Sequence, residues 1–233
     1  MAVFHASTTC RGRSRGRTCA APQRIVLGLL LAIGLCPAWT AAQPEGSGLP
    51  VLRQAPLASM LSASEAHGAV SNGAASAYSN PAAGAFADDA AVQLGYTFWI
   101  SGITTQYAGV LLKRENHSFG FGLYNSGTDD LQARDRPGPS DGRFSAGTLS
   151  LSGLYAYRWR NLAVGGALHV LREEVFQYRA SGYSLSAGIA GQFASGRVSS
   201  GLSLEHAGRM EALDLSRTDV PTQLRMAAAV RLA

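Results

Sequence analysis

Cysteine is scarce in this chain, and all of it lies near the N-terminus. The three cysteines are Cys10, Cys19 and Cys36. All three precede the cleavage position predicted in the next paragraph, so we expect a mature protein without disulfides, thiol nucleophiles or cysteine-based metal sites. The same part of the chain also lacks an apolar run long enough for a membrane-spanning helix. The uncharged run from Ile25 to Cys36 is shorter than the roughly 20 residues that a membrane-spanning helix needs.

The first 42 residues have the layout of a secretory signal peptide. Five arginines and no acidic residue occupy positions 1–24, an apolar stretch follows at 25–36, and small residues surround Ala42. A basic region, an apolar region and small residues at the cleavage position define such signals. The sequence therefore predicts export and cleavage after about Ala42. A short buried helix is the alternative interpretation of the apolar stretch.

Removal of this segment would also remove the excess positive charge. The full chain has a net charge of +5, from 20 basic and 15 acidic residues. Five of the basic residues and none of the acidic ones precede Gln43. The mature chain is therefore close to neutral, and we do not expect it to bind nucleic acid, which would call for a basic surface.

From Ala91 onward, hydrophobicity alternates with a period of two. Large apolar residues alternate with small or polar ones over 91–99 and again over 162–172. Successive side chains of a strand point to opposite faces, so this pattern predicts a sheet with two different environments. Gln93, Thr97 and His169 fall on the small and polar face and are predicted to face a lumen.

Eight strands follow from this alternation. We place them at about 91–99, 103–112, 118–126, 146–158, 162–172, 178–193, 197–206 and 223–233. Most connections are short, but 128–145 and 207–222 are long, polar and rich in turn residues, and are expected to be loops. Outer-membrane barrels place short turns on the periplasmic side and long loops outside.

These features predict an all-β fold, an antiparallel transmembrane β-barrel of about eight strands. Aromatic residues near the strand ends agree with the aromatic girdles of such barrels. The alternative is a soluble β-sandwich, which shows similar alternation. We favour the barrel because the strands are longer than the usual 5–6 residues or so. Their polar face also carries Ser, Gly, Ala and Gln rather than Lys and Glu.

Residues 43–90 differ in composition from the predicted barrel at 91–233. Residues 43–53 are expected to form a loose leader. Ala, Ser and Gly dominate the remainder. Within it, Asn80 is suited to cap a helix and Pro81 to begin one, which predicts a short helix over 82–87. The segment is either an exposed linker or a small plug folded into the mouth of the barrel.

Four stretches carry a resemblance to a known family. They are Asn80, Pro81, Ala82 and Gly84 ahead of the first strand; the loop and strand from Asp129 to Tyr157; Leu162–Leu168; and Pro221 with Arg225 at the opening of the last strand. From about Leu57 to the C-terminus they resemble the PorV/PorQ family of outer-membrane proteins, which is related to FadL-type barrels. Ala83 and Val220 depart from the usual Gly and Leu of that family.

The resemblance implies a protein of the bacterial outer membrane that works in type IX secretion. Its partners would be membrane lipid, secreted cargo proteins and other components of the secretion system. Relatives on the FadL side move hydrophobic small molecules, which is the alternative function, and a structural barrel fragment without a transport role is a third. Because family members usually contain several more strands, the chain is either part of a larger barrel or a small closed one.

Catalysis and metal binding find little support in the residues. The mature histidines are His67, His117, His169 and His206. Glu205 and His206 are adjacent, so regular alternation places them on opposite faces. No Gly-x-Ser-x-Gly nucleophile elbow occurs, and the aspartates at 129, 130, 135 and 141 lack the spacing of a calcium loop. We therefore expect a non-enzymatic protein with no metal and no cofactor.

Overall fold

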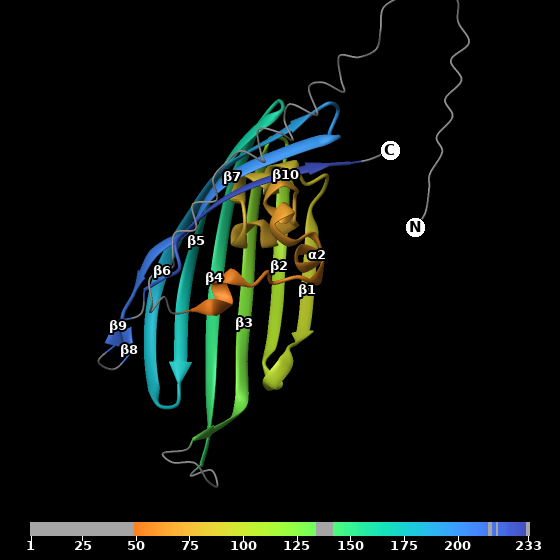
Figure 1. The fold of residues 1–233 in the computed structure, drawn as a ribbon. Coiled ribbons are helices and arrows are strands. Elements are labelled where there is room, and N and C mark those ends of the chain that lie inside the picture. The colour runs from red at the N-terminus through yellow and green to blue at the C-terminus, as the bar shows by residue number, and fades with distance from the viewer. Residues whose placement is uncertain (1–48, 134–141, 214–215, 218, 232–233) are drawn as a thin grey trace, which may run out of the picture. The chain divides into compact units, whose positions relative to one another are not determined.

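The computed structural model describes residues 49–133, 142–213, 216–217 and 219–231. The predicted signal peptide lies outside these residues, as does the centre of the first long loop. Eight strands form one sheet in the order β1-β2-β3-β4-β5-β6-β7-β10, and every neighbouring pair is antiparallel (Figure 1). All eight agree with the strands expected from the alternation. Their bounds are β1 (Ala91–Phe98), β2 (Thr104–Arg114), β3 (His117–Ala133), β4 (Gly142–Trp159), β5 (Leu162–Val175), β6 (Tyr178–Phe193), β7 (Val198–Met210) and β10 (Gln223–Val230).

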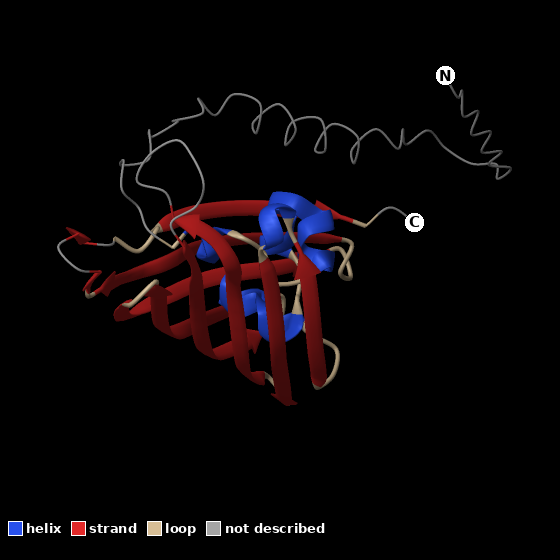
Figure 2. Cartoon of the chain, turned by 90° about the horizontal axis from the view of Figure 1, so that it is seen from below, coloured by secondary structure: helices blue, strands red, loops and turns tan. Residues whose placement is uncertain are grey.

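The described helices are short, and most precede the sheet. They are η1 (Pro50–Arg53), α2 (Ala58–Ala63), η2 (Ser64–Ala69), η3 (Gly73–Tyr78), η4 (Pro81–Phe86) and, between the first two strands, η5 (Ile100–Gly102). None of them is long and apolar enough to cross a membrane. Residues 49–90, here called the N-terminal segment, lie within the curve of the sheet, as Figure 2 shows.

Three boundaries differ from those expected. The predicted loop 128–145 is mostly strand, because β3 runs to Ala133 and β4 begins at Gly142. The predicted loop 207–222 loses its start to β7 and contains a small pair, β8 (Ala212–Leu213) with β9 (Ser216–Arg217). Polar residues enter these strands because the antiparallel ladder pairs their backbone groups whatever the side chains are. The pairing register of β3 with β4 shifts at a bulge between Thr128 and Leu131, and the two strands continue to pair beyond it.

The two faces of the sheet have different compositions. The convex face carries most of the large apolar side chains, and on β1 the outward residues Val92, Leu94 and Phe98 are 76%, 78% and 77% exposed. The concave face carries mostly small and polar side chains that are buried, such as Ser152, together with a few large ones such as Leu171. The predicted alternation is therefore real, and what buries the concave face is the N-terminal segment.

Much of the N-terminal segment is itself buried. Leu49 and Leu52 are 1% and 2% exposed, and most of η3 and η4 is inaccessible to solvent. The expectation of a loose leader is therefore wrong for residues 49–53, because their apolar side chains join the core. The exposed-linker alternative for the rest of the segment is wrong for the same reason.

The sheet is not closed into a barrel. β1 and β10 are the two ends of the strand order, and they do not pair with each other in the described part of the chain. The structure therefore establishes an all-β, antiparallel, curved sheet around an inner segment.

Glycines in the wall allow the N-terminal segment to lie against the strands. A methyl group on Gly165 of β5 would lie 2.6 Å from the Ala82 nitrogen, and one on Gly188 of β6 would overlap the side-chain oxygen of Asn80. Such contacts are shorter than side-chain carbons make in proteins, so the backbone of η4 reaches the wall only because these side chains are absent.

We predict that Gly188→Val destabilises the folded protein by about 1–3 kcal/mol, the usual cost of overpacking. The added methyls would displace Asn80 and the turn that it holds. Thermal unfolding of the refolded protein in detergent measures the loss, and protease cleavage within 49–90 should become faster. Gly153→Val is the matched control, because nothing lies within 4 Å of a methyl group at Gly153. Equal stability of the two variants would contradict this packing.

Candidate functional site

Asn80 fixes the N-terminal segment to the wall of the sheet. Its side-chain oxygen accepts a hydrogen bond from the Ala82 nitrogen at 3.1 Å, which caps η4 as the sequence predicts. Its side-chain nitrogen donates to the Gly68 oxygen at 3.1 Å and to the Ile189 oxygen at 3.0 Å. Because Asn80 is fully buried, these three bonds replace those it would make with water.

The other predicted motif residues of the segment are also interior. Pro81 is the first residue of η4 and is buried, as is Ala82. The helix is a 3-10 helix that ends at Phe86, one residue before the predicted end. Gly84 faces the Leu154 side chain, and a methyl group added to Gly84 would lie 3.4 Å from the nearest Leu154 carbon. These residues therefore serve the docking of the segment, with no polar side chain presented to solvent.

His169, predicted to face the lumen, lies on the concave face of β5 and is fully buried. Its Nε2–H donates to the Ala77 oxygen at 3.1 Å, and its ring contacts the Tyr78 ring with 4.8 Å between centroids. The Tyr78 hydroxyl donates to Ser150 Oγ at 3.1 Å. Burial raises the pKa of Tyr78 above its ordinary value, so this tyrosine stays neutral.

Gln93 and Thr97, the other two predicted lumen-facing residues, are on the concave side of β1 and are half-buried. The Gln93 side-chain oxygen accepts a hydrogen bond from the Ala75 nitrogen at 3.4 Å, so it binds η3. Thr97 is opposite Thr105 of β2. Two of the three predicted residues thus contact the N-terminal segment directly.

Pro221 and Arg225 open the last strand as the sequence suggests. The Thr222 nitrogen donates to the Val220 oxygen at 2.9 Å, which makes a tight turn centred on Pro221. The turn leads into β10, where Arg225 points to the concave side and is half-buried.

Arg225 belongs to a buried polar group that we call the inner cluster, consisting of His67, Ser203, Glu205 and Arg225. One Arg225 nitrogen lies 3.5 Å from a Glu205 oxygen, with side chains 11% and 2% exposed, and the same nitrogen donates to His67 Nε2 at 2.7 Å. Ser203 Oγ donates to Glu205 at 2.7 Å. The cluster joins two strands to η2. His67 accepts at Nε2, so its proton is on Nδ1 and the ring is neutral.

The expectation that Glu205 and His206 lie on opposite faces is wrong. Both are buried on the concave side, with 1% exposure each. A bulge shifts the β6–β7 register between Leu185 and Ala187, and His206 has a φ of 54°. The extra residue interrupts strict alternation and turns two successive side chains inward. The imidazole rings of His206 and His169 are consequently 5.0 Å apart.

The inner cluster itself was missed, although one signal pointed to it. Alternation along β10 places Arg225 on the small and polar face, and a buried guanidinium requires a carboxylate nearby. Glu205 supplies it, but only the bulge brings Glu205 into place. His67 comes from a segment whose path no periodicity predicts.

Several polar groups of the interior have hydrogen-bond partners within the protein. Ser150 Oγ accepts a hydrogen bond from the Tyr78 hydroxyl, and Ser203 Oγ donates one to the Glu205 carboxylate. No group of three or more His, Cys, Asp or Glu residues in the described ranges is arranged to hold a metal ion. The bonds from Tyr78 to Ser150 and from Arg225 to His67 cross the boundary between the segment and the sheet.

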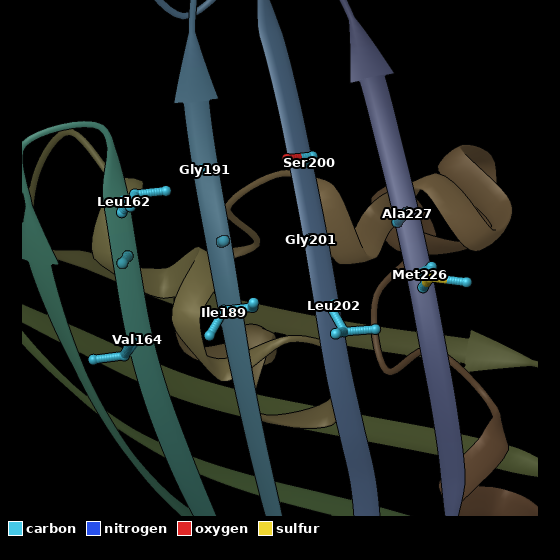
Figure 3. Close-up of a pocket in the computed structure, with 11 residues that line it drawn as sticks. Leu162, Val164, Ile189, Gly191, Ser200, Gly201, Leu202, Met226 and Ala227 are labelled. Carbon is cyan, nitrogen blue, oxygen red and sulfur yellow. The ribbon is translucent and has the colours of Figure 1, made fainter. Parts of the chain in front are cut away.

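The convex face has a shallow apolar hollow of about 420 Å³. Leu162, Val164, Ile189, Leu202 and Met226 project from β5, β6, β7 and β10 around small residues such as Gly191 and Ser200 (Figure 3). It is continuous with the exposed apolar residues of the neighbouring strands.

No protein-family model and no curated protein matches this chain.

We predict that Arg225→Met destabilises the protein by about 3–5 kcal/mol, since it leaves the Glu205 carboxylate buried without its cation. Adding Glu205→Gln should recover part of the loss, because the unpaired charge then disappears. Chemical denaturation of the single and double variants measures both effects. The control is Arg179→Gln, which removes a solvent-exposed ion pair with Glu174 and should change stability little. Additive single-variant effects would contradict direct coupling.

Proposed function

We propose that this protein is a bacterial outer-membrane β-barrel protein of the PorV/PorQ type, which serves surface delivery of proteins secreted by the type IX system. The observation that carries the proposal is the separation of the two faces of the sheet. Large apolar side chains cover the convex face, and the interior behind it combines the apolar core of the N-terminal segment with buried polar groups. Membrane barrels likewise carry an apolar band outside and polar groups inside.

The extent of the exposed apolar surface supports a lipid-facing role. Large apolar side chains that are at least 50% exposed occur on seven of the eight strands of the sheet. Examples, one from each of β1, β2, β3, β4, β5, β6 and β10 in turn, are Val92, Leu112, Phe121, Leu151, Val170, Ile189 and Met226. A soluble monomer rarely exposes a contiguous apolar patch larger than a few hundred Å². A face of this kind across seven strands fits lipid contact better.

Exposed aromatic residues lie toward both ends of the strands. Trp159 and Phe193 adjoin the short turns at one end, while Phe176 and Tyr178 adjoin the turn at the other. Membrane barrels place aromatic girdles at both interfaces. The spacing between these two groups therefore marks the part of the sheet that would lie in lipid.

The packed interior favours protein delivery over transport of small molecules. Ala82, Ala83 and Ala85 are at most 1% exposed against the wall, and Asn80 and the inner cluster hold the segment in place. A FadL-like channel for hydrophobic molecules, the second candidate, would need this segment to move. A protein that presents its surface to secreted cargo would not.

The membrane location predicts a specific sensitivity. Leu168→Arg, on the convex face at the middle of β5, should reduce folding into bilayers by about 2–4 kcal/mol, the cost of an arginine near the midplane. The comparison variant is Gln177→Arg, which places the same charge in an exposed turn. The measurement is the fraction of protein whose gel mobility changes on boiling after refolding into vesicles. A soluble protein would tolerate Leu168→Arg as well as Gln177→Arg.

Deletion of the gene in the bacterium that encodes it separates the two candidate functions. Protein delivery predicts that specific proteins disappear from the cell surface and that the intact chain restores them. A FadL-like channel predicts slower uptake of long-chain fatty acids with an unchanged surface proteome. Complementation with Gly188→Val provides a variant with a loosened interior, and Gly153→Val is its control. An unchanged surface proteome would overturn the proposed role in secretion.

A further inference from the structure

The two edge strands of the sheet each have a row of backbone groups that pair with no other described strand. Within the described residues, β1 and β10 each pair on one side only. An unpaired edge promotes aggregation in water, and in lipid each unsatisfied backbone group costs several kcal/mol. The membrane location proposed above therefore requires partners for both edges.

The eight strands cannot supply those partners to each other while the N-terminal segment stays inside. The interior of an eight-stranded barrel has room for side chains or one small ligand. Here it would have to hold residues 49–90. The segment also contacts both edge strands, since Gly68 lies against Ala227 of β10 and Ala75 binds Gln93 of β1.

The directions of the edge strands suit a second copy of the chain. β1 and β10 are the first and last of eight strands whose neighbours are all antiparallel, so they run in opposite directions. Two copies with the same orientation can therefore place β1 of each beside β10 of the other, antiparallel at both junctions. The combined sheet has about sixteen strands, the size class of porins, whose interior is wide enough for two segments.

We infer that two copies of this chain complete one barrel through β1–β10 pairing at two equivalent junctions. Keeping the apolar residues on the same face allows only registers in which outward positions lie opposite one another. One such register places Val92 opposite Val230, Tyr96 opposite Met226 and Phe98 opposite Leu224. It overlaps the two strands, each of 8 residues, over almost their whole length.

Charge and size also fit this register. Ala91 is opposite Arg231, which places Arg231 diagonal to Asp89, and both charged side chains are exposed in the single chain. Diagonal neighbours of opposite charge in antiparallel strands attract each other. On the inner side, Gly95 is opposite Ala227, so the junction adds no bulk next to the segment.

Disulfide trapping between two differently tagged chains tests this inference. One chain carries Tyr96→Cys and the other Met226→Cys, and both are expressed together and oxidised in isolated membranes. All native cysteines lie within residues 1–36, ahead of the predicted cleavage position. The pairs that combine the two variants should migrate as a two-chain species that contains both tags and separates under reduction, while pairs of the same variant should form no disulfide. Leu168→Cys replaces Tyr96→Cys in the control, because Leu168 lies in the middle of the sheet and should form no two-chain species.

A chain with both Tyr96→Cys and Met226→Cys distinguishes the alternatives. A disulfide within one chain, with no two-chain product, would mean that the eight strands close on themselves and would overturn the inference. If the double variant forms neither the within-chain nor the two-chain disulfide, the inference is overturned as well. Because fractionation with the membrane is measured on the same samples, a failure of pairing in a membrane-bound chain leaves the proposed location standing.

Discussion

The structure depends on close contact between the backbone of η4 and the glycine-containing wall of β5 and β6. Asn80 makes this contact specific, because its amide bonds its own helix, η2 and β6 at once. Gly165 and Gly188 make it possible, because any side chain there would occupy the space of the segment. Without the segment, the concave face of the sheet would be exposed, and neither face would be packed against another part of the described chain.

The inner cluster adds a second connection of different character. The contact at η4 is made of backbone and small side chains, whereas Arg225, Glu205 and His67 are large, polar and buried. Buried ion pairs contribute little net stability, but breaking one is costly. The cluster therefore fixes where η2 lies against β7 and β10 more than it holds the fold together. The two connections together explain why a segment with little large apolar surface docks in one place.

The sequence predicts the strands well and the interior only in part. Period-two alternation locates all eight strands because lipid or solvent on one side and packing on the other impose opposite residue types on successive positions. Asn80 and Pro81 predict the start of η4 because capping is a local interaction. The pairing of Glu205 with Arg225 depends on a bulge, and the strand extensions beyond Thr128 depend on partner strands. Neither of these leaves a periodic signal in the sequence.

The same limit applies to closure of the sheet. Alternation is identical for a closed barrel, a half-barrel and a sheet completed by another chain, so the eight-strand count could not distinguish them. The packing of the N-terminal segment against the concave face argues against closure of the eight strands alone, because the interior of an eight-stranded barrel is filled by its own side chains.

The most direct test of the account is whether the convex face contacts lipid. Trp159 is 65% exposed on that face, and Trp99→Phe leaves it as the single tryptophan after Ala42. Its fluorescence should be strongly quenched when the protein is refolded into vesicles of brominated lipid. It should be little affected by acrylamide in the surrounding water. Unchanged emission in brominated lipid, with strong quenching by acrylamide, would contradict a membrane-embedded sheet.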